Sequence, residues 1–237
     1  METHGAAPNF SFFADEEEGF NKLRTGFSAN LTHPCLGALP KFKAAGLTLP
    51  IDTSRLENWD KILPALTGLS DFVDEDGTVW AVPFDWGNTG IIYRTDKIEA
   101  DKVSVQLFAD PEYAGRVSMS DNIYDAYALA IGLKSWENVS AEQVDQMSDF
   151  LRKVHNNVRF YWVDQGQLDS AIKSGEIELA FAWNATELAL QADDVPVTMV
   201  RDADIGVASW ACGYVHLKDG PGDDDAVYDY QNAITSA

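Results

Sequence analysis

The sequence predicts an α/β fold in which helices alternate with short apolar strands. Helix-like and strand-like segments follow one another along the chain without internal repeats or low-complexity linkers, and 46% of the 237 residues are hydrophobic. Such alternation is typical of a mainly parallel sheet covered by helices. A chain of this length can bury a large core, either as one domain or as two lobes.

The first half of the chain is expected to contribute two helices and a long strand-rich segment. Residues 15–27 open with acidic side chains, which favour a helix N-terminus, and then carry apolar residues at helical spacing. Residues 39–47 have the pattern of a second helix that ends at a glycine. Residues 78–96 are rich in β-forming residues and are interrupted by Pro83 and Gly87.

The second half is expected to contain three further helices and a buried strand. Residues 125–133 are apolar enough for a buried helix, and residues 140–154 form an amphipathic helix for which Ser140 is a suitable cap. Residues 177–183 are a short apolar run typical of a strand, and residues 223–237 start a helix with acidic side chains at its positive end.

The charge of the chain is strongly negative. It has 38 acidic and 17 basic residues, a formal net charge of −21. Nucleic acid is not an expected partner, because phosphate binding requires clustered Lys and Arg side chains. An acidic surface favours solubility and attracts cationic ligands. The sequence also lacks an apolar run of roughly 18 residues, the length that spans a bilayer.

Motifs that signal catalysis are missing from the sequence. It has no phosphate-binding loop, no dinucleotide fingerprint, no HExxH, no GxSxG and no CxxC. The four histidines are scattered without metal-ligand spacing, and the acidic segment 219–226 does not fit a calcium-binding EF-hand loop. We therefore expect no catalytic residue, no metal and no cofactor.

A set of phrases, in order along the chain, carries a family resemblance. They are "LTHPCLGALPKFKAAGLTLPID" (31–52), "WAVPFDWGNTGIIYRTDKI" (80–98), "DPEYAGRVSMSDNIYDA" (110–126), "SGEIELAFAWNATE" (174–187) and "SWACGYVHLKDG" (209–220). Together they resemble the extracellular solute-binding proteins of ABC importers, most closely the spermidine/putrescine-binding branch. In that branch the second phrase carries Pro–aromatic–x–Trp–Gly–x–Thr–Gly, and the last two phrases each carry a tryptophan.

The resemblance implies an α/β, two-lobed periplasmic-binding-protein fold of the type II-like class, with the ligand held between the lobes. Residues 1–88 and 209–237 would form lobe 1, and residues 89–208 would form lobe 2. The chain is expected to be truncated at both ends relative to the family, since it opens at about the first helix and lacks a secretory signal. A periplasmic location, an ABC permease in the inner membrane as partner, and a monomer are the corresponding expectations.

Five of the expected ligand-binding residues come from this comparison and its hinge positions. Amine ligands need carboxylates for their ammonium groups and aromatic faces for their methylene chains. Asp125 matches an acidic ligand contact, although an aspartate that opens a helix is also a common cap. Trp183 and Trp210 match two pocket tryptophans, with core packing as the alternative. Asp85 and Trp86 lie at the first expected crossing between the lobes, and Asp85 is not an acid that the family carries there.

Three further positions depart from the family pattern. Cys212 stands where polyamine binders carry an aspartate two residues after the tryptophan, Asn122 stands where some members have an acid, and Cys35 stands where a serine lines the cleft. Losing a charged contact costs about 2–3 kcal/mol, or tens to a hundredfold in affinity. Monoamines, or amines with another polar group, are therefore expected to compete well with spermidine.

The two cysteines leave three interpretations open. They could form a disulfide, pack separately as small hydrophobic residues, or provide a nucleophile; separate packing is the preferred one. The family position of both residues predicts Cα atoms within about 10 Å of each other. The leading function is a solute receptor for an amine-like compound. The alternatives are a cysteine-dependent enzyme on the same scaffold, in which His33 would be the nearest base in sequence, and a truncated fragment that binds nothing.

Overall fold

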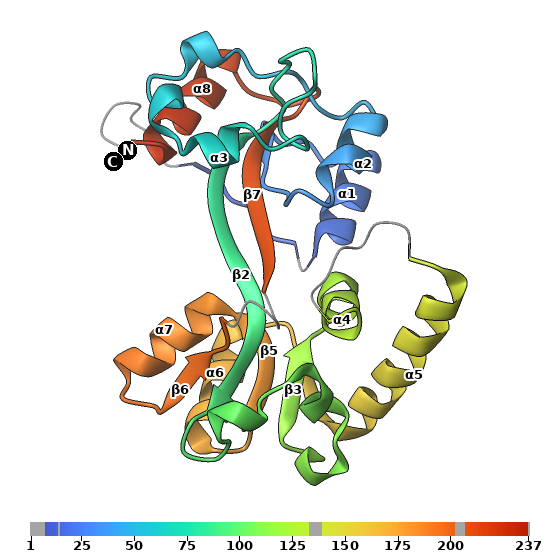
Figure 1. Cartoon of the computed structure of the whole chain (residues 1–237). Helices are drawn as coiled ribbons and strands as arrows, with labels where there is room; N and C mark the ends of the chain where they lie inside the picture. Colours follow the sequence, from blue (N-terminus) through green and yellow to red (C-terminus); the bar gives the residue numbers. More distant parts are fainter. Residues whose placement is uncertain (1–7, 14, 133–138, 202–206, 237) are drawn as a thin grey trace. The chain divides into compact units, whose positions relative to one another are not determined.

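The computed structural model describes residues 8–13, 15–132, 139–201 and 207–236 (Figure 1). The chain divides into two compact units: unit 1 is Met1–Trp86 with Trp210–Ala237, and unit 2 is Gly87–Ser209. Each of the five buried apolar clusters found among the described residues lies wholly inside one unit. Each unit therefore has its own hydrophobic core.

Unit 1 combines short helices with strand segments. Its elements are α1 (Glu16–Arg24), β1 (Leu31–Thr32), α2 (Leu39–Ala44), the 3₁₀ turns Thr53–Arg55 and Trp59–Lys61, α3 (Pro64–Thr67), the start of β2 (Val82–Arg94), most of β7 (Ala208–His216) and α8 (Asp224–Ile234). Asp15 caps α1 by accepting a hydrogen bond from the Glu18 amide at 2.7 Å. Phe20 of α1 packs edge-to-face on Phe42 of α2, with ring centroids 5.2 Å apart. The helices expected at 15–27, 39–47 and 223–237 are confirmed as α1, α2 and α8. α1 and α8 are shorter at both ends, and α2 begins at Leu39 as expected but ends earlier, at Ala44.

Unit 2 is a sheet with helical crossovers. Its elements are the rest of β2, the 3₁₀ turns Ala100–Lys102, Val105–Ala109 and Pro111–Tyr113, then β3 (Val117–Ser120), α4 (Ile123–Ala130), α5 (Ala141–Asn157), β4 (Val158–Trp162), α6 (Gln165–Ser174), β5 (Leu179–Trp183), α7 (Asn184–Ala192) and β6 (Val197–Met199). The helix expected at 125–133 corresponds to α4, which begins two residues earlier and ends at Ala130; residue 133 lies outside the described ranges. The helix expected at 140–154 is confirmed as α5. Ser140 and Gln143 form a reciprocal capping box at the start of α5.

The expectation of a mainly parallel sheet is wrong. β3 runs parallel to β4 and β5, but β2 is antiparallel to both β5 and β6, and β1 is antiparallel to β7. The parallel strands are those that helices connect, because a helical crossover returns the chain in the same direction. β2 has no such crossover to its neighbours and lies between two strands of the opposite direction.

The hydrogen-bonded strands do not fall into one separate sheet for each unit. The strand order runs β1-β7-β2-β5-β3-β4, with β6 paired to β2. β2 takes part in both units: its start lies against β7 in unit 1, where a Cβ on Gly213 would come within 2.7 Å of the Val82 carbonyl oxygen. Its second half pairs with β5 from Thr89 to Tyr93 in unit 2. The two cores are separate, whereas the order of strands is continuous through β2.

Candidate functional site

Three parallel strands of unit 2 end together at one edge of the sheet. β3 ends at Ser120, β4 at Trp162 and β5 at Trp183, and Ser120 pairs directly with Trp162. A helix starts within a few residues of each strand end. In open α/β sheets, ligands bind at the carboxyl ends of the strands, where loops and helix N-termini offer polar groups. This edge is therefore the candidate site of unit 2.

Asp125 is the acidic residue of this edge. It lies in the first turn of α4, and its carboxylate accepts a hydrogen bond from the Ser120 hydroxyl. Burial raises the pKa of Asp125, while hydrogen bonds from Ser120 and Thr89 act in the opposite direction. Both hydroxyl residues are buried, with Thr89 only 1% exposed. The result is a largely desolvated carboxylate held by two neutral hydroxyl groups.

Asn122, and not Asp125, supplies the cap of α4. The Asn122 side chain accepts a hydrogen bond from the Tyr124 amide at 2.8 Å, which is the usual N-cap interaction. The role of helix cap, which the sequence left open for Asp125, therefore belongs to Asn122. Asn122 itself is exposed and carries no charge.

Trp183 lies opposite Thr89, a neighbour of Asp125, and packs against a second tryptophan. It pairs in register with Thr89, the residue whose hydroxyl contacts Asp125. Its ring packs edge-to-face on Trp162, with centroids 4.9 Å apart and an interplanar angle of 89°. Trp162 is 1% exposed and donates its Nε1–H to the Phe181 carbonyl at 3.2 Å. Trp183 is only partly buried, so it packs on the core and still presents ring surface.

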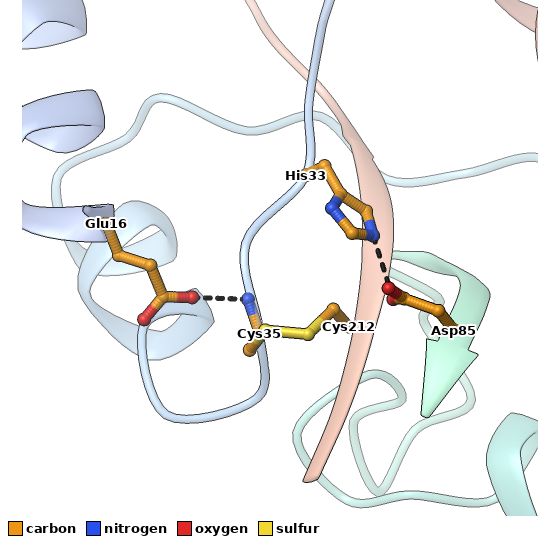
Figure 2. Close-up of a disulfide and its surroundings, with 5 residues drawn as sticks. All are labelled: Glu16, His33, Cys35, Asp85 and Cys212. Carbon is orange, nitrogen blue, oxygen red and sulfur yellow. Dashed lines mark hydrogen bonds and ion pairs between the residues drawn. A yellow bond between two sulfur atoms is a disulfide. The ribbon is translucent and has the colours of Figure 1, made fainter. Parts of the chain in front are cut away.

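In unit 1, Cys35 and Cys212 form a disulfide (Figure 2). Their Cα atoms are 3.8 Å apart, which confirms the expected proximity and corrects the preferred interpretation of two separate hydrophobic residues. The two residues face each other in an antiparallel ladder, because the Leu36 amide donates to the Ala211 carbonyl and the Gly213 amide donates to the Pro34 carbonyl. The backbone register alone brings the sulfur atoms together.

The disulfide has a carboxylate neighbour in α1. The Cys35 amide donates a hydrogen bond of 2.5 Å to Glu16 Oε1. Burial raises the pKa of Glu16, and this hydrogen bond partly opposes the effect. Neither cysteine is a free thiol in this structure, so no thiolate is present to act as the nucleophile of the alternative enzyme.

The remaining expected residues of unit 1 lie on β2 and β7. Asp85 Oδ1 is 3.0 Å from His33 Nε2 (Figure 2). Trp86 is 56% exposed, and Trp210 is half-buried on β7, two residues before Cys212. The sequence reasoning did not anticipate the His33 contact or the role of Trp162, Ser120 and Thr89. For His33, the sequence offered its position two residues before Cys35, a spacing that puts two side chains on one face where the backbone is extended.

Metal binding and membrane insertion receive no support within the described ranges. Those residues contain no group of three or more His, Cys, Asp or Glu side chains that could hold a metal ion. None of the helices described there is both long and apolar enough to cross a bilayer.

Comparison with known proteins shows the family of this chain. The family of bacterial extracellular solute-binding proteins matches residues 13–237. The chain belongs to this family. The putrescine/agmatine-binding protein of Pseudomonas aeruginosa is 25% identical over 204 residues, which cover 77% of this chain and 54% of that protein. The putrescine-binding periplasmic protein PotF of Escherichia coli is 29% identical over 173 residues, covering 67% of this chain and 45% of PotF. The chain thus spans about half the length of these curated relatives.

Solved structures show the same fold at lower sequence identity. A putative spermidine/putrescine ABC transporter protein from Listeria monocytogenes superposes with a TM-score of 0.85 at 19% identity, over 99% of this chain and 71% of that one. The PotD lipoprotein of Treponema pallidum gives a TM-score of 0.80 at 18% identity, over 94% and 70% of the two chains. The fold is therefore the two-lobed α/β fold of the periplasmic binding proteins, as the resemblance implied.

Proposed function

We propose that this protein is the solute-binding component of an ABC importer and that it binds a small amine. Family membership and the putrescine- and agmatine-binding relatives support the transport role. The observation that carries the choice of ligand is the desolvated Asp125 carboxylate, which lies beside Trp183 at the carboxyl edge of the parallel strands.

Asp125 is well suited to an ammonium group because its present neighbours are neutral. The groups that hydrogen-bond to it, Ser120 and Thr89, stabilise the carboxylate only in part, and its pKa stays raised by burial. A ligand ammonium would supply the missing positive charge. A hydrogen bond between charged groups contributes about 1.5–3 kcal/mol in such surroundings. Uncharged sugars would leave this buried charge without compensation.

The aromatic residues would hold the apolar part of the ligand. The partly buried Trp183 can contact a methylene chain and can add a cation–π contribution of about 0.5–2 kcal/mol. We assign Trp210, Trp86 and Asp85 to a second set of contacts, in unit 1. Cys212, which stands where polyamine binders present an acid, is 3% exposed and bonded to Cys35, so a second strong charge–charge contact is not available from it.

These features favour amines with few charges. Because Asn122 and the disulfide are both neutral, spermidine would bring more ammonium groups than the assigned residues can pair. Desolvating an unpaired ammonium group is costly, so a monoamine or an amine with a hydrogen-bonding tail should compete well with spermidine.

A disulfide also supports a location outside the cytoplasm. Such bonds persist in oxidising compartments and are rare in the cytosol. We therefore place the protein in the periplasm or at the outer face of the membrane, with an ABC permease as partner. A cysteine-dependent enzyme is the weaker candidate, because its nucleophile would have to be released from the Cys35–Cys212 bond first.

Calorimetry on purified protein tests the proposal. Putrescine, agmatine, butylamine, spermidine and an uncharged sugar are titrated into the wild type, Asp125→Asn and the matched control Asp121→Asn. Asp121 is an exposed acid four residues away, so its loss should change amine affinity by less than about threefold. Asp125→Asn should weaken amine binding by about 10- to 100-fold. Tight sugar binding without a response to amines, or unchanged amine affinity in Asp125→Asn, would refute the proposal.

A further inference from the structure

The antiparallel ladder of β2 and β5 ends at the candidate site of unit 2 (Figure 1). Its last backbone pair joins Thr89, whose hydroxyl contacts Asp125, to Trp183, the tryptophan of the edge. Beyond this pair the chain leaves β5, because helix α7 begins at Asn184. Two residues of the proposed amine site therefore lie at the end of a ladder, where strand pairing opens most easily.

The Asn184 side chain prolongs this ladder by one position. In the antiparallel register of the two strands, the residue opposite Asn184 is Asn88. The Asn88 amide donates a hydrogen bond of 3.0 Å to Asn184 Oδ1. Because the Asn184 backbone already belongs to a helix, whose carbonyl groups accept from amides four residues later, the side-chain oxygen provides the contact to β2.

The junction of β5 and α7 has no side-chain cap. Trp183 occupies the N-cap position of α7, and its indole ring has no oxygen that could accept a hydrogen bond from the first amides of the helix. The bond from Asn88 to Asn184 therefore restrains the backbone at this junction in the absence of a cap.

β2 is also held from its other side, within the same unit. Ser209 Oγ donates a hydrogen bond of 2.9 Å to Asn88 Oδ1. A Cβ on Gly90 would come within 3.1 Å of Val207 Cγ1, so the chain at the start of β7 passes close to β2. Asn88 is thus fixed through its side chain, and its backbone amide is a firm anchor for Asn184.

We propose that Asn184 is a positioning residue of the amine site, which keeps the Thr89 hydroxyl on Asp125 through its bond to β2. The same bond fixes the end of β5 and with it Trp183. This inference rests on the proposed amine-binding function. Without the Asn184 bond the last pair of the ladder opens more readily, and Asp125 is then without one of its two hydroxyl donors. An amine has to order the site as it binds, which weakens its affinity.

Calorimetry with putrescine compares Asn184→Ala with a matched control, Asn157→Ala. Asn157 is an asparagine of the same unit whose Nδ2 donates to the Phe108 carbonyl at 3.0 Å and to the Asp110 carbonyl at 2.7 Å. It lies at the start of β4, whereas the site lies where that strand ends. Asn184→Ala should weaken putrescine binding by about 5- to 20-fold. Asn157→Ala should destabilise unit 2 and change the affinity by less than about twofold.

Titration of the Asp125 carboxyl group, followed by carbon-13 NMR, is a readout that needs no ligand and that a general loss of stability would not move. The hydrogen bond from Thr89 lowers the pKa of Asp125, so a variant that loses this bond should titrate at higher pH than the wild type. Asn184→Ala and Thr89→Val should both shift the titration in this direction, and Asn157→Ala should not.

A double-mutant cycle tests whether Asn184 acts through Thr89. In Asn184→Ala/Thr89→Val, the loss of binding free energy should be smaller than the sum of the two single losses, because both variants remove the same contact to Asp125. In the wild type, the Asn88 amide should exchange slowly with solvent, a measurement that does not depend on any variant folding.

The outcomes separate this inference from the proposed function. If putrescine binds the wild type, but Asn184→Ala changes neither the affinity nor the Asp125 titration more than Asn157→Ala does, the inference is overturned and amine binding stands. Additive effects of Asn184→Ala and Thr89→Val, or fast exchange of the Asn88 amide, would also overturn it. If no amine binds the wild type, the proposed function is overturned and the inference falls with it.

Discussion

Breaking the Cys35–Cys212 bond should destabilise unit 1 by several kcal/mol and leave unit 2 almost unchanged. The perturbation is the double variant Cys35→Ser/Cys212→Ser, or a reductant applied to the wild type. Serine is close to cysteine in size, and the backbone hydrogen bonds on either side of the pair remain. The folded state therefore loses little, and the main effect is on the unfolded chain.

The magnitude follows from the length of chain that the bond closes. The two cysteines are 177 residues apart in sequence. In the chain-entropy description, a loop of that length costs the unfolded state about 5 kcal/mol at 25 °C if the whole chain unfolds. Unit 2 lies inside this loop. If unit 2 stays folded while unit 1 unfolds, roughly 50 residues of the loop become flexible, and the stabilisation is about 4 kcal/mol.

Hydrogen exchange resolved by segment is the suitable assay, because it reports the two units separately. The variant should lose about 4 kcal/mol of protection in α1 and α2, while α5 and α6 keep theirs. A reductant should reproduce the loss in the wild type and have no effect on the double variant, which serves as the control. An equal loss in both units would refute separate unfolding, and a loss below about 1 kcal/mol would refute the loop-closure reasoning.

Three further predictions concern single residues. Burial raises the pKa of Asp125, so the protonated group contributes stability at low pH, and this contribution is lost as pH rises through the folded pKa. Denaturant titrations from pH 3 to 8 without ligand measure the free energy of unfolding. Asp125→Asn should not show this decrease in unfolding free energy with pH, and it should be at least as stable as the wild type at pH 7. Phe42→Ala removes a ring that is 1% exposed and should lower the unfolding free energy of unit 1 by about 3–5 kcal/mol, measured by hydrogen exchange in α2. Ser140→Ala removes one half of the capping box with Gln143 and should cost about 1 kcal/mol in α5, with a change below about 0.3 kcal/mol counting against the cap.

Local structure was largely readable from the sequence. Helix α5 could be placed because Ser140 is a capping residue and apolar residues follow it at helical spacing, and both signals act within a few residues. The strand-rich segment around Pro83 and the short apolar strand before Trp183 could be found for the same reason. Burial within this helix was harder to assign, since Met147 and Val144 are three residues apart, yet Met147 is buried and Val144 is 36% exposed.

The family could also be inferred from the sequence, because its phrases keep their order along the chain and the match to residues 13–237 agrees with them. The positions of Asp125 and Trp183 came from that comparison. Whether these two residues bind a ligand stays a prediction.

The tertiary structure alone decided which distant residues meet. The sequence left three interpretations of the cysteines open, since residues 177 positions apart carry no signal of their register. In the fold, the register of β1 with β7 continues to an isolated antiparallel bridge that places Cys35 opposite Cys212. Similarly, the Thr89 contact to Asp125 and the His33 contact to Asp85 depend on how β2 lies in the fold. Capping and periodicity are local and can be read from a few neighbouring residues. Strand register and side-chain contacts across a sheet depend on the packing of the whole core, so only the folded chain shows them.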